Sequence, residues 1–261
     1  VGRAPRSTHA GEAPASVWAW RAFGVFMGMC SASQTAANGY LGEVLGYSNI
    51  ACSDIGGTSF DVALITQNEL TIRNDPDMAR LVLSLELVDR LTLEPVLAGW
   101  EGLGVVVQAY QKRGLAVIEG LGRLAATRGR RLMIRLVKGA YWDTEIKRAQ
   151  VFGRTDYPVF TTKAATDLNY LVCARAMIEA SPAIYSQFAS HNAHTLAAVR
   201  RMARDHGVTV EHQRLHGMGE ALYDAAQEAW ADETVIVRAY APVGGHEELL
   251  PYLVRRLLEN G

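Results

Sequence analysis

The spacing of hydrophobic and polar residues changes character near residue 80 of this 261-residue chain. Between residues 49 and 73, short β-branched runs alternate with turn residues, which predicts three strands in a small antiparallel meander. From about residue 80 onward, compact apolar runs alternate with longer segments of helical spacing. The chain is therefore expected to combine two differently organised parts.

The second part predicts five strand–helix units. Strands are expected over 104–110, 131–137, 183–190, 210–214 and 234–240. Helices are expected over 81–91, 116–129, 143–153, 166–180, 193–207, 219–230 and 246–261, with Thr166 as a cap and Gly129 as a helix end. Strands that are apolar on both faces and alternate with helices are typical of a parallel sheet covered by helices. Eight units would close a (β/α)₈ barrel, so five predict an α/β fold with an incomplete barrel of the TIM type.

Polar and cationic side chains follow the predicted strand ends, where such barrels carry their functional residues. The first strand ends in Gln108, and the second carries Arg135 near its end and is followed by Lys138 and two aromatic residues. Later strands end in the sequences SHNAH, RLHGMGE and YAPVGGH. This rim suits a large cofactor that bears carbonyls, ring nitrogens and phosphates.

Each of these features also has a structural interpretation. A single Arg at a strand end is commonly part of a surface ion pair. His191 and His194 have a spacing compatible with zinc, but no third ligand follows at a recognisable spacing, so no metal site is predicted. Arg255, Arg256 and Glu259 could form a solvated helix face.

The composition narrows the class of protein. The net charge of -1 gives no reason to expect a nucleic-acid partner. Three distant cysteines form no pair and favour a reducing cytoplasm. The apolar run at 22–29 is shorter than a membrane span and has no convincing cleavage site after it. Residues 1–29 are expected to be disordered or loosely ordered, in part because 1–16 are rich in Ala, Pro, Ser and Gly.

Residues 83–261 resemble the proline dehydrogenase domain of bacterial bifunctional proline utilization A, a FAD-dependent (β/α)₈ barrel. The segments that carry the resemblance are LAGWEGLGVVVQAYQKR, RLMIRLVKGAYWDTEIKRAQ, FASHNAHTLAA, RLHGMGE and YAPVGGHEELLPYLVRRLLENG, in the family's order. The resemblance implies oxidation of L-proline to Δ1-pyrroline-5-carboxylate, with electrons passing to a membrane quinone. It implies a cytoplasmic location, compatible with peripheral association at the inner membrane, and leaves the oligomeric state open.

The resemblance also implies roles for individual residues. Arg135 corresponds to a cation near flavin N5, Tyr141 and Tyr240 to aromatics that close over the substrate ring, and Arg255 and Arg256 to a clamp for the proline carboxylate. Two guanidiniums can hold a planar carboxylate through bidentate bonds, which agrees with this role. The implied FAD contacts are Gln108, Arg135, Val137, Lys138, Gly139, Ala140, Trp142, Thr161, Thr162, Lys163, His191, Asn192, Gln213, Leu215 and Glu259.

Residues 30–82 resemble a different group, the hydantoinase A, acetone carboxylase and 5-oxoprolinase proteins, whose ATP-binding domain is actin-like. In such folds Asp54 and the segment 56–59 would form a phosphate-binding hairpin. A hairpin without the opposite lobe forms no nucleotide cleft, so ATP turnover is not expected.

The join between the two resemblances has consequences for activity. With the join at this place, the chain lacks the first three strands of the family's barrel and the active-site Lys on the first of them. Asn74 stands roughly where the family has an Asp. Proline oxidation is therefore expected to be impaired, and FAD binding to be weak or absent. The alternatives are a fragment of an ATP-dependent hydantoinase or acetone carboxylase subunit, or an inactive chimera.

Overall fold

The structure is a computed structural model that describes residues 24–26, 49–55, 60–66, 69–73, 79–230 and 235–241, together with Leu250 and Val254. Leu250 and Val254 are helical, within the range of the last predicted helix. Arg255, Arg256, Glu259 and the predicted phosphate-binding segment 56–59 lie outside the described residues.

The first part of the chain forms a four-stranded sheet in the order β1-β2-β3-β4. Strands β2 (Asn49–Ile55), β3 (Phe60–Thr66) and β4 (Glu69–Arg73) pair antiparallel, which confirms the predicted meander. Strand β1 (Gly24–Phe26) adds to it by pairing parallel with β2.

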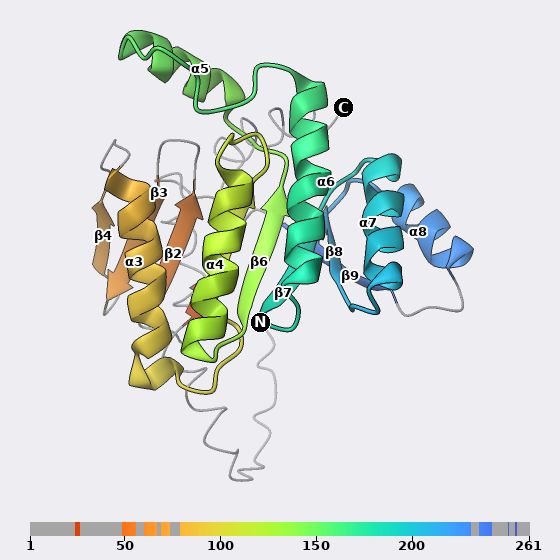
Figure 1. Ribbon diagram of the computed structural model, residues 1–261, viewed down its shortest axis with the longest axis horizontal. Helices are drawn as coiled ribbons and strands as arrows, with labels where there is room; N and C mark the ends of the chain where they lie inside the picture. Colours follow the sequence, from red (N-terminus) through yellow and green to blue (C-terminus); the bar gives the residue numbers. More distant parts are fainter. Residues whose placement is uncertain are drawn as a thin grey trace, which may run out of the picture.

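The second part begins with helix α3 (Ala79–Leu93) and a 3₁₀ turn (Pro95–Leu97). It continues as alternating strands and helices: β5 (Gly104–Gln108), α4 (Gly114–Arg128), β6 (Leu132–Val137), α5 (Trp142–Val151), α6 (Lys163–Glu179), β7 (Ile184–Ala189), α7 (Ala193–Asp205), β8 (Glu211–Leu215), α8 (Glu220–Ala229) and β9 (Ile236–Tyr240). The strands form one parallel sheet in chain order, β5 to β9 (Figure 1). The predicted α/β fold with five barrel strands is confirmed. Strand β2 of the first sheet contacts β5, so the two sheets lie side by side.

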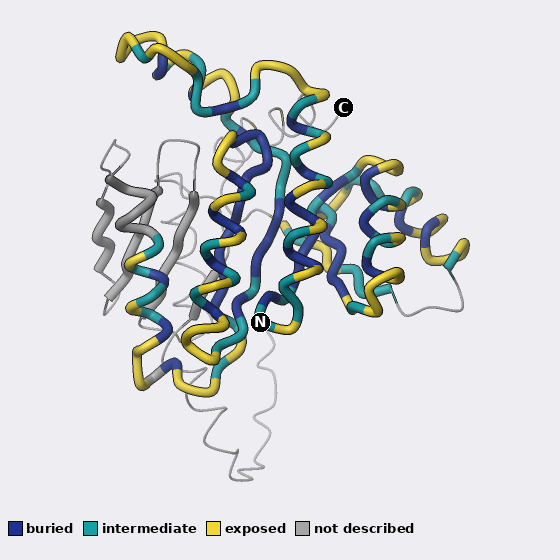
Figure 2. Tube along the Cα trace, in the orientation of Figure 1, coloured by how far each residue is buried: buried dark blue, intermediate teal, exposed yellow. Residues whose placement is uncertain are grey.

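Helices α4, α6 and α7 cover the outer face of the parallel sheet (Figure 1). The core lies between these helices and the strands, where the tube is coloured as buried in Figure 2. Alternate residues of β6 and β7 point into it, among them Leu132, Ile134, Leu136, Ile184 and Phe188. Burying one such side chain contributes roughly 1.5–3 kcal/mol, so this layer is the main source of the fold's stability.

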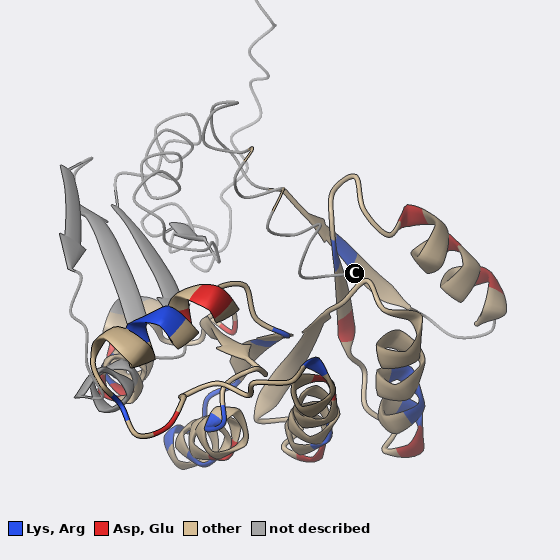
Figure 3. Cartoon of the chain, turned by 90° about the horizontal axis from the view of Figure 1, so that it is seen from above, with Lys and Arg blue, Asp and Glu red and all other residues tan. Residues whose placement is uncertain are grey.

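The opposite, inner face of the sheet is polar. Arg135 alternates with the core residues of β6, so its side chain points to the inner face. Gln187 on β7 and Glu211 on β8 point to the same face. All three side chains are buried. The prediction of strands that are apolar on both faces is therefore wrong for the inner face, which carries hydrogen-bonding groups. In the described part of the chain, charged residues also lie on the helices, largely on the sides that face away from the sheet (Figure 3).

Local sequence explains where two helices begin and end. Helix α4 ends as predicted at Gly129, whose φ of 58° is the left-handed conformation that glycine adopts readily. Helix α6 begins earlier than predicted, because the side chain of Thr162, not Thr166, accepts a hydrogen bond from Ala165 N. Thr166 is a buried residue within the first turns of α6, so its prediction as a cap is wrong.

None of the helices in the described part of the chain combines the length and the apolar character needed to span a bilayer.

Candidate functional site

The carboxyl ends of the five parallel strands lie at one edge of the sheet, and the sequence-predicted residues follow this edge. Arg135 and Val137 are on β6, and the loop that follows carries Lys138, Gly139 and Ala140. The other predicted residues within the described ranges lie at neighbouring strand ends or in the segments that begin or precede a helix: Gln108, Tyr141, Trp142, Thr161, Thr162, Lys163, His191, Asn192, Gln213, Leu215 and Tyr240.

The loop after β6 folds over the end of β5. The buried Gln108 side chain accepts a hydrogen bond from Ala140 N at 3.2 Å, and Tyr110 N donates to Lys138 O at 2.7 Å. Gly139 has a φ of 141°, and a Cβ atom at this position would lie 2.5 Å from the Tyr110 ring. Glycine is therefore required here by both the backbone conformation and the close approach of the ring.

Arg135 reaches across the inner face of the sheet. Its guanidinium carbon lies 4.2 Å from the centre of the Tyr240 ring, within range of a cation–π interaction. Strands β6 and β9 are separated by two other strands, which in a flat sheet is roughly 14 Å. The contact therefore indicates a sheet that curves inward, as barrel strands do. Arg135 Nε is buried and has no hydrogen-bond partner among the described residues.

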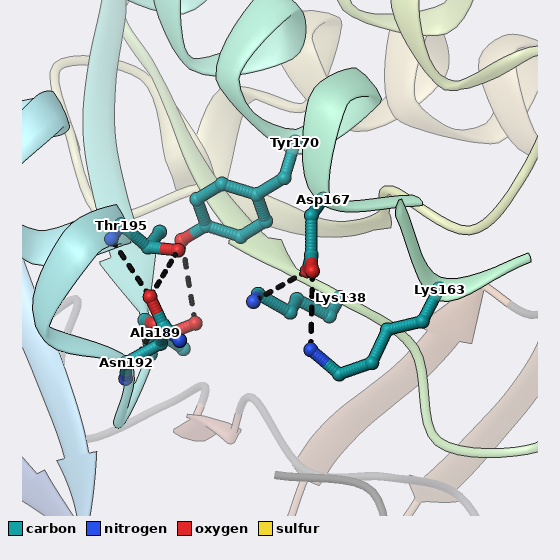
Figure 4. A network of polar contacts seen from close by, with 8 residues as sticks. Lys138, Lys163, Asp167, Tyr170, Ala189, Asn192 and Thr195 are labelled. Carbon is teal, nitrogen blue, oxygen red and sulfur yellow. Dashed lines mark hydrogen bonds and ion pairs between the residues drawn. The ribbon is translucent and has the colours of Figure 1, made fainter. Parts of the chain in front are cut away.

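Two of the predicted cations share one carboxylate (Figure 4). Lys138 Nζ lies 2.6 Å from Asp167 Oδ1, and Lys163 Nζ lies 3.1 Å from Oδ2. Partial burial alone would raise the pKa of Asp167, but the two ammonium groups outweigh that effect and hold it below its usual value. Asp167 therefore ties the loop after β6 to the first turn of α6, and both lysines stay near the strand ends.

The loop after β7 is held by His191 and Asn192. Leu215 N donates to His191 Nε2 at 3.0 Å, so the neutral ring carries its proton on Nδ1. Burial, followed by the charge of Arg214, lowers the pKa of His191, which favours this neutral form. Asn192 caps helix α7 by accepting from Thr195 N at 2.9 Å, a contact drawn in Figure 4. His191 Nδ1 is buried and lacks a partner among the described residues.

Two buried tyrosines join the helices to the strand ends. The Tyr223 hydroxyl of α8 lies 2.8 Å from Ser190 O and 3.1 Å from Gln213 O, which bridges β7 and β8. The Tyr170 hydroxyl of α6 lies 3.3 Å from Ala189 O (Figure 4). These contacts satisfy backbone carbonyls that emerge where the strands end.

Glu211 is a buried carboxylate that the sequence analysis did not select. It is fully buried on the inner face of β8 and receives hydrogen bonds from Gln187, Gln213 and Arg238. Burial alone would raise its pKa, but the bonds from Arg238 and Gln213 and the Arg238 charge hold the pKa of this carboxyl below its usual value. The signal in the sequence was the run of four consecutive polar residues in β8, which is unusual for a buried strand.

Not all predicted residues point toward a common centre. Trp142 is partly exposed, at 38%, and donates through its indole nitrogen to Phe160 O at 2.8 Å. Thr161 is exposed, and Thr162 serves as a helix cap. For these three residues the structure gives local structural roles, and their contact with a cofactor stays a prediction.

The inner face and strand ends present polar atoms that need partners. Arg135 Nε, Gln187 Oε1 and His191 Nδ1 are buried and without hydrogen-bond partners among the described residues. An unpaired buried polar group costs about 1–3 kcal/mol, so such groups usually meet a ligand or water. Within the same ranges no cluster of three or more His, Cys, Asp or Glu side chains could hold a metal ion. The class of protein is thus an α/β partial barrel whose inner face and strand ends carry buried polar groups.

Comparison with known proteins identifies the family. The profile of the family described as proline dehydrogenase matches residues 62–261, and the chain belongs to this family. The bifunctional protein PutA of Salmonella typhimurium is 53% identical over 203 residues, which are 76% of this chain and 15% of that protein. The crystal structure of a point mutant of proline utilization A from Bradyrhizobium japonicum is 55% identical and superposes with a TM-score of 0.64 over 72% of this chain and 19% of that one. The chain therefore spans about one sixth of the length of these relatives.

A shorter similarity supports the second resemblance. A stretch of 49 residues, 19% of this chain, is 90% identical to the acetone carboxylase beta subunit of Xanthobacter autotrophicus and covers 7% of that protein. The chain is thus similar to two groups of proteins, over stretches of very different length. The match to proline dehydrogenase covers most of the chain, so the function is sought there.

Proposed function

We propose that this chain carries part of the site of a FAD-dependent proline dehydrogenase that oxidises L-proline to Δ1-pyrroline-5-carboxylate. The observation that carries the proposal is the strand-end convergence, in a member of this family, of Arg135, Lys138, Lys163 and His191. Donors of this kind suit the phosphates, carbonyls and ring nitrogens of a flavin dinucleotide.

The residues present fit such a cofactor. Arg135 Nε and His191 Nδ1 are buried donors that have no partner within the described ranges, whereas Gln187 Oε1 offers an acceptor on the same inner face as Arg135. The lysines held by Asp167 bring positive charge to the strand ends, where a diphosphate would be stabilised. When bound, the flavin supplies the redox chemistry by accepting a hydride equivalent from the substrate.

The chain's own residues would orient the substrate and stabilise charge. Arg135 is held by the Tyr240 ring and keeps a fixed positive charge beside the site, where it would stabilise negative charge that develops during the reaction. We further propose that Arg255 and Arg256 clamp the proline carboxylate, with Tyr141 and Tyr240 over the substrate ring and Glu259 near the cofactor. Such a clamp fixes the reacting carbon and lowers the entropic part of the barrier.

The test is FAD binding, measured by flavin fluorescence with the purified chain, together with proline-dependent reduction of a soluble quinone analogue. Substitution Arg135→Met should weaken FAD binding about tenfold or more, because a charged hydrogen bond contributes roughly 1.5–3 kcal/mol. Arg131→Met is the matched control, since the Arg131 guanidinium also lies over a tyrosine ring, that of Tyr185, at 4.7 Å. Equal losses in the two variants, or no FAD binding by the unchanged chain, would overturn the proposal.

The clamp has its own test. Substitution Arg255→Ala should raise the KM for proline far more than it weakens FAD binding, because the arginine is assigned to the substrate. An unchanged KM would refute the clamp.

We also propose that electrons pass to a membrane quinone from a cytoplasmic protein that associates peripherally with the inner membrane. Binding to liposomes that contain quinone, compared with liposomes without it, tests this assignment.

A further inference from the structure

Glu211 belongs to one row of paired residues on the inner face. The strand register places Val106, Arg135, Gln187, Glu211 and Ile236 side by side across β5 to β9. The side chains of this row share the inner face because residues that pair directly across parallel strands point to the same side. Arg135, Gln187 and Glu211 therefore form a continuous buried polar strip.

The carboxylate of Glu211 accepts hydrogen bonds from four side chains. Gln187 Nε2 and Gln213 Nε2 donate to Oε1 at 3.0 and 2.7 Å. Arg238 donates from Nε to Oε1 at 3.0 Å and from Nη2 to Oε2 at 2.9 Å. The Tyr185 hydroxyl lies 3.4 Å from Oε2. One fully buried carboxylate thus organises groups from β7, β8 and β9.

The charge of Glu211 decides which way the two amides face. An ionised carboxylate can only accept hydrogen bonds, so each glutamine must direct its NH₂ group toward Glu211. The carbonyl oxygens of Gln187 and Gln213 then face away from the carboxylate. Gln187 Oε1 is buried and has no partner among the described residues, which leaves it available to a ligand.

We propose that Glu211 is a positioning residue of the cofactor site, which fixes the amides of Gln187 and Gln213 so that both turn an acceptor oxygen toward the ligand. This inference rests on the proposed function and deepens it. A flavin carries ring N–H and ribityl O–H groups, which are donors that such acceptors recognise. Arg135, the neighbour of Gln187 in the row, supplies the complementary donor.

The test uses the full chain with Glu211→Gln, which keeps the size of the side chain and removes its charge. The new amide can present either NH₂ or oxygen, so Gln187 and Gln213 lose their fixed orientation. FAD affinity should fall about tenfold, which corresponds to about 1.4 kcal/mol. Glu220→Gln is the matched control, because Glu220 is an exposed carboxylate paired with Arg214 at 3.3 Å. It should leave the FAD affinity unchanged.

A double-mutant cycle separates positioning from general stability. Gln187→Met should weaken FAD binding on its own, and its combination with Glu211→Gln should lose less than the two single effects together. Fully additive losses, or a Glu211→Gln protein that melts at a lower temperature but binds FAD as before, would overturn the proposal. If Glu211→Gln does not fold, Gln187→Met alone tests the proposal, and full FAD affinity in that variant would refute it.

The orientation itself can be measured without a cofactor. In the apoprotein, the side-chain amide protons of Gln187 and Gln213 should exchange slowly with solvent, and Glu211→Gln should remove that protection. Rapid exchange in the unchanged protein would refute the orientation. If the unchanged chain binds no FAD, the proposed function and the flavin part of this inference fall together, while the exchange measurement still supports or refutes the orientation.

Discussion

His212 provides a direct test of the packing between the sheet and its helices. It lies on β8 with its ring toward the helices, 1% exposed, and its ring centre is 6.5 Å from that of Phe188. Neither ring nitrogen has a hydrogen-bond partner among the described residues. Burial, followed by the charge of Arg200, lowers the pKa of His212 to about 4.

The lowered pKa makes the stability of the fold depend on pH. An unfolded histidine has a pKa of about 6.5, so on acidification the unfolded chain takes up a proton at His212 before the folded protein does. The stabilising effect of the neutral ring is complete above about pH 6.5, and it is lost as the pH falls from there toward about 4. The total is about 3 kcal/mol, of which about 2 kcal/mol is lost by about pH 5.

The measurement is the free energy of unfolding in urea, followed by tryptophan fluorescence, at a series of pH values from about 8 down to about 5. His212→Leu removes the titrating group, so this variant should lose about 2 kcal/mol less over the range. His194→Leu, which changes an exposed histidine, should keep the pH dependence of the unchanged protein. A His212→Leu curve parallel to that of the unchanged protein would show that His212 is not buried as a neutral ring.

Three further predictions concern the site and the core. Gly139→Ala should lower the thermal midpoint by at least about 3 °C, because the new Cβ would meet the Tyr110 ring; an unchanged midpoint in differential scanning calorimetry would contradict this packing. Asn192→Ala should cost about 1 kcal/mol in urea unfolding, through loss of the cap at Thr195 N, and a cost near zero would mean that the cap does not hold α7. Cys173 is fully buried and burial raises its pKa to about 12, so in the native protein it should resist a thiol reagent that labels it completely in urea; mass spectrometry of its peptide reports the extent, and rapid native labelling would refute the burial.

Most of the fold could be predicted because its periodicity is local. The strand at 104–108 and the helix that ends at Gly129 each follow from a short run of apolar spacing and one turn residue. The start of α6 could not be fixed in the same way, because Thr162 and Thr166 are both acceptable caps and tertiary packing buries Thr166. Which residue caps a helix depends on how the whole helix packs, not on the preference of one residue.

The site was predicted less completely than the fold. Arg135 and Lys138 were recognisable because they lie near the end of a buried strand and directly after it. Asp167 and Glu211 were not, because their importance comes from partners 24 to 29 residues away in the sequence, such as Lys138 and Gln187. Such pairings arise from strand order and sheet curvature, which no local pattern in the chain encodes.

The contact between Arg135 and Tyr240 restricts how a flat molecule can approach. The guanidinium carbon lies over the aromatic ring, 4.2 Å from its centre, so the ring blocks one side of the cation. A planar guest must therefore meet Arg135 from a side that the ring leaves open, and the direction of docking is restricted before any guest arrives. Replacing Tyr240 by Phe would keep this restriction, whereas a small residue at this position would open a further direction of approach, and mispositioned binding would follow even though Arg135 itself was unchanged.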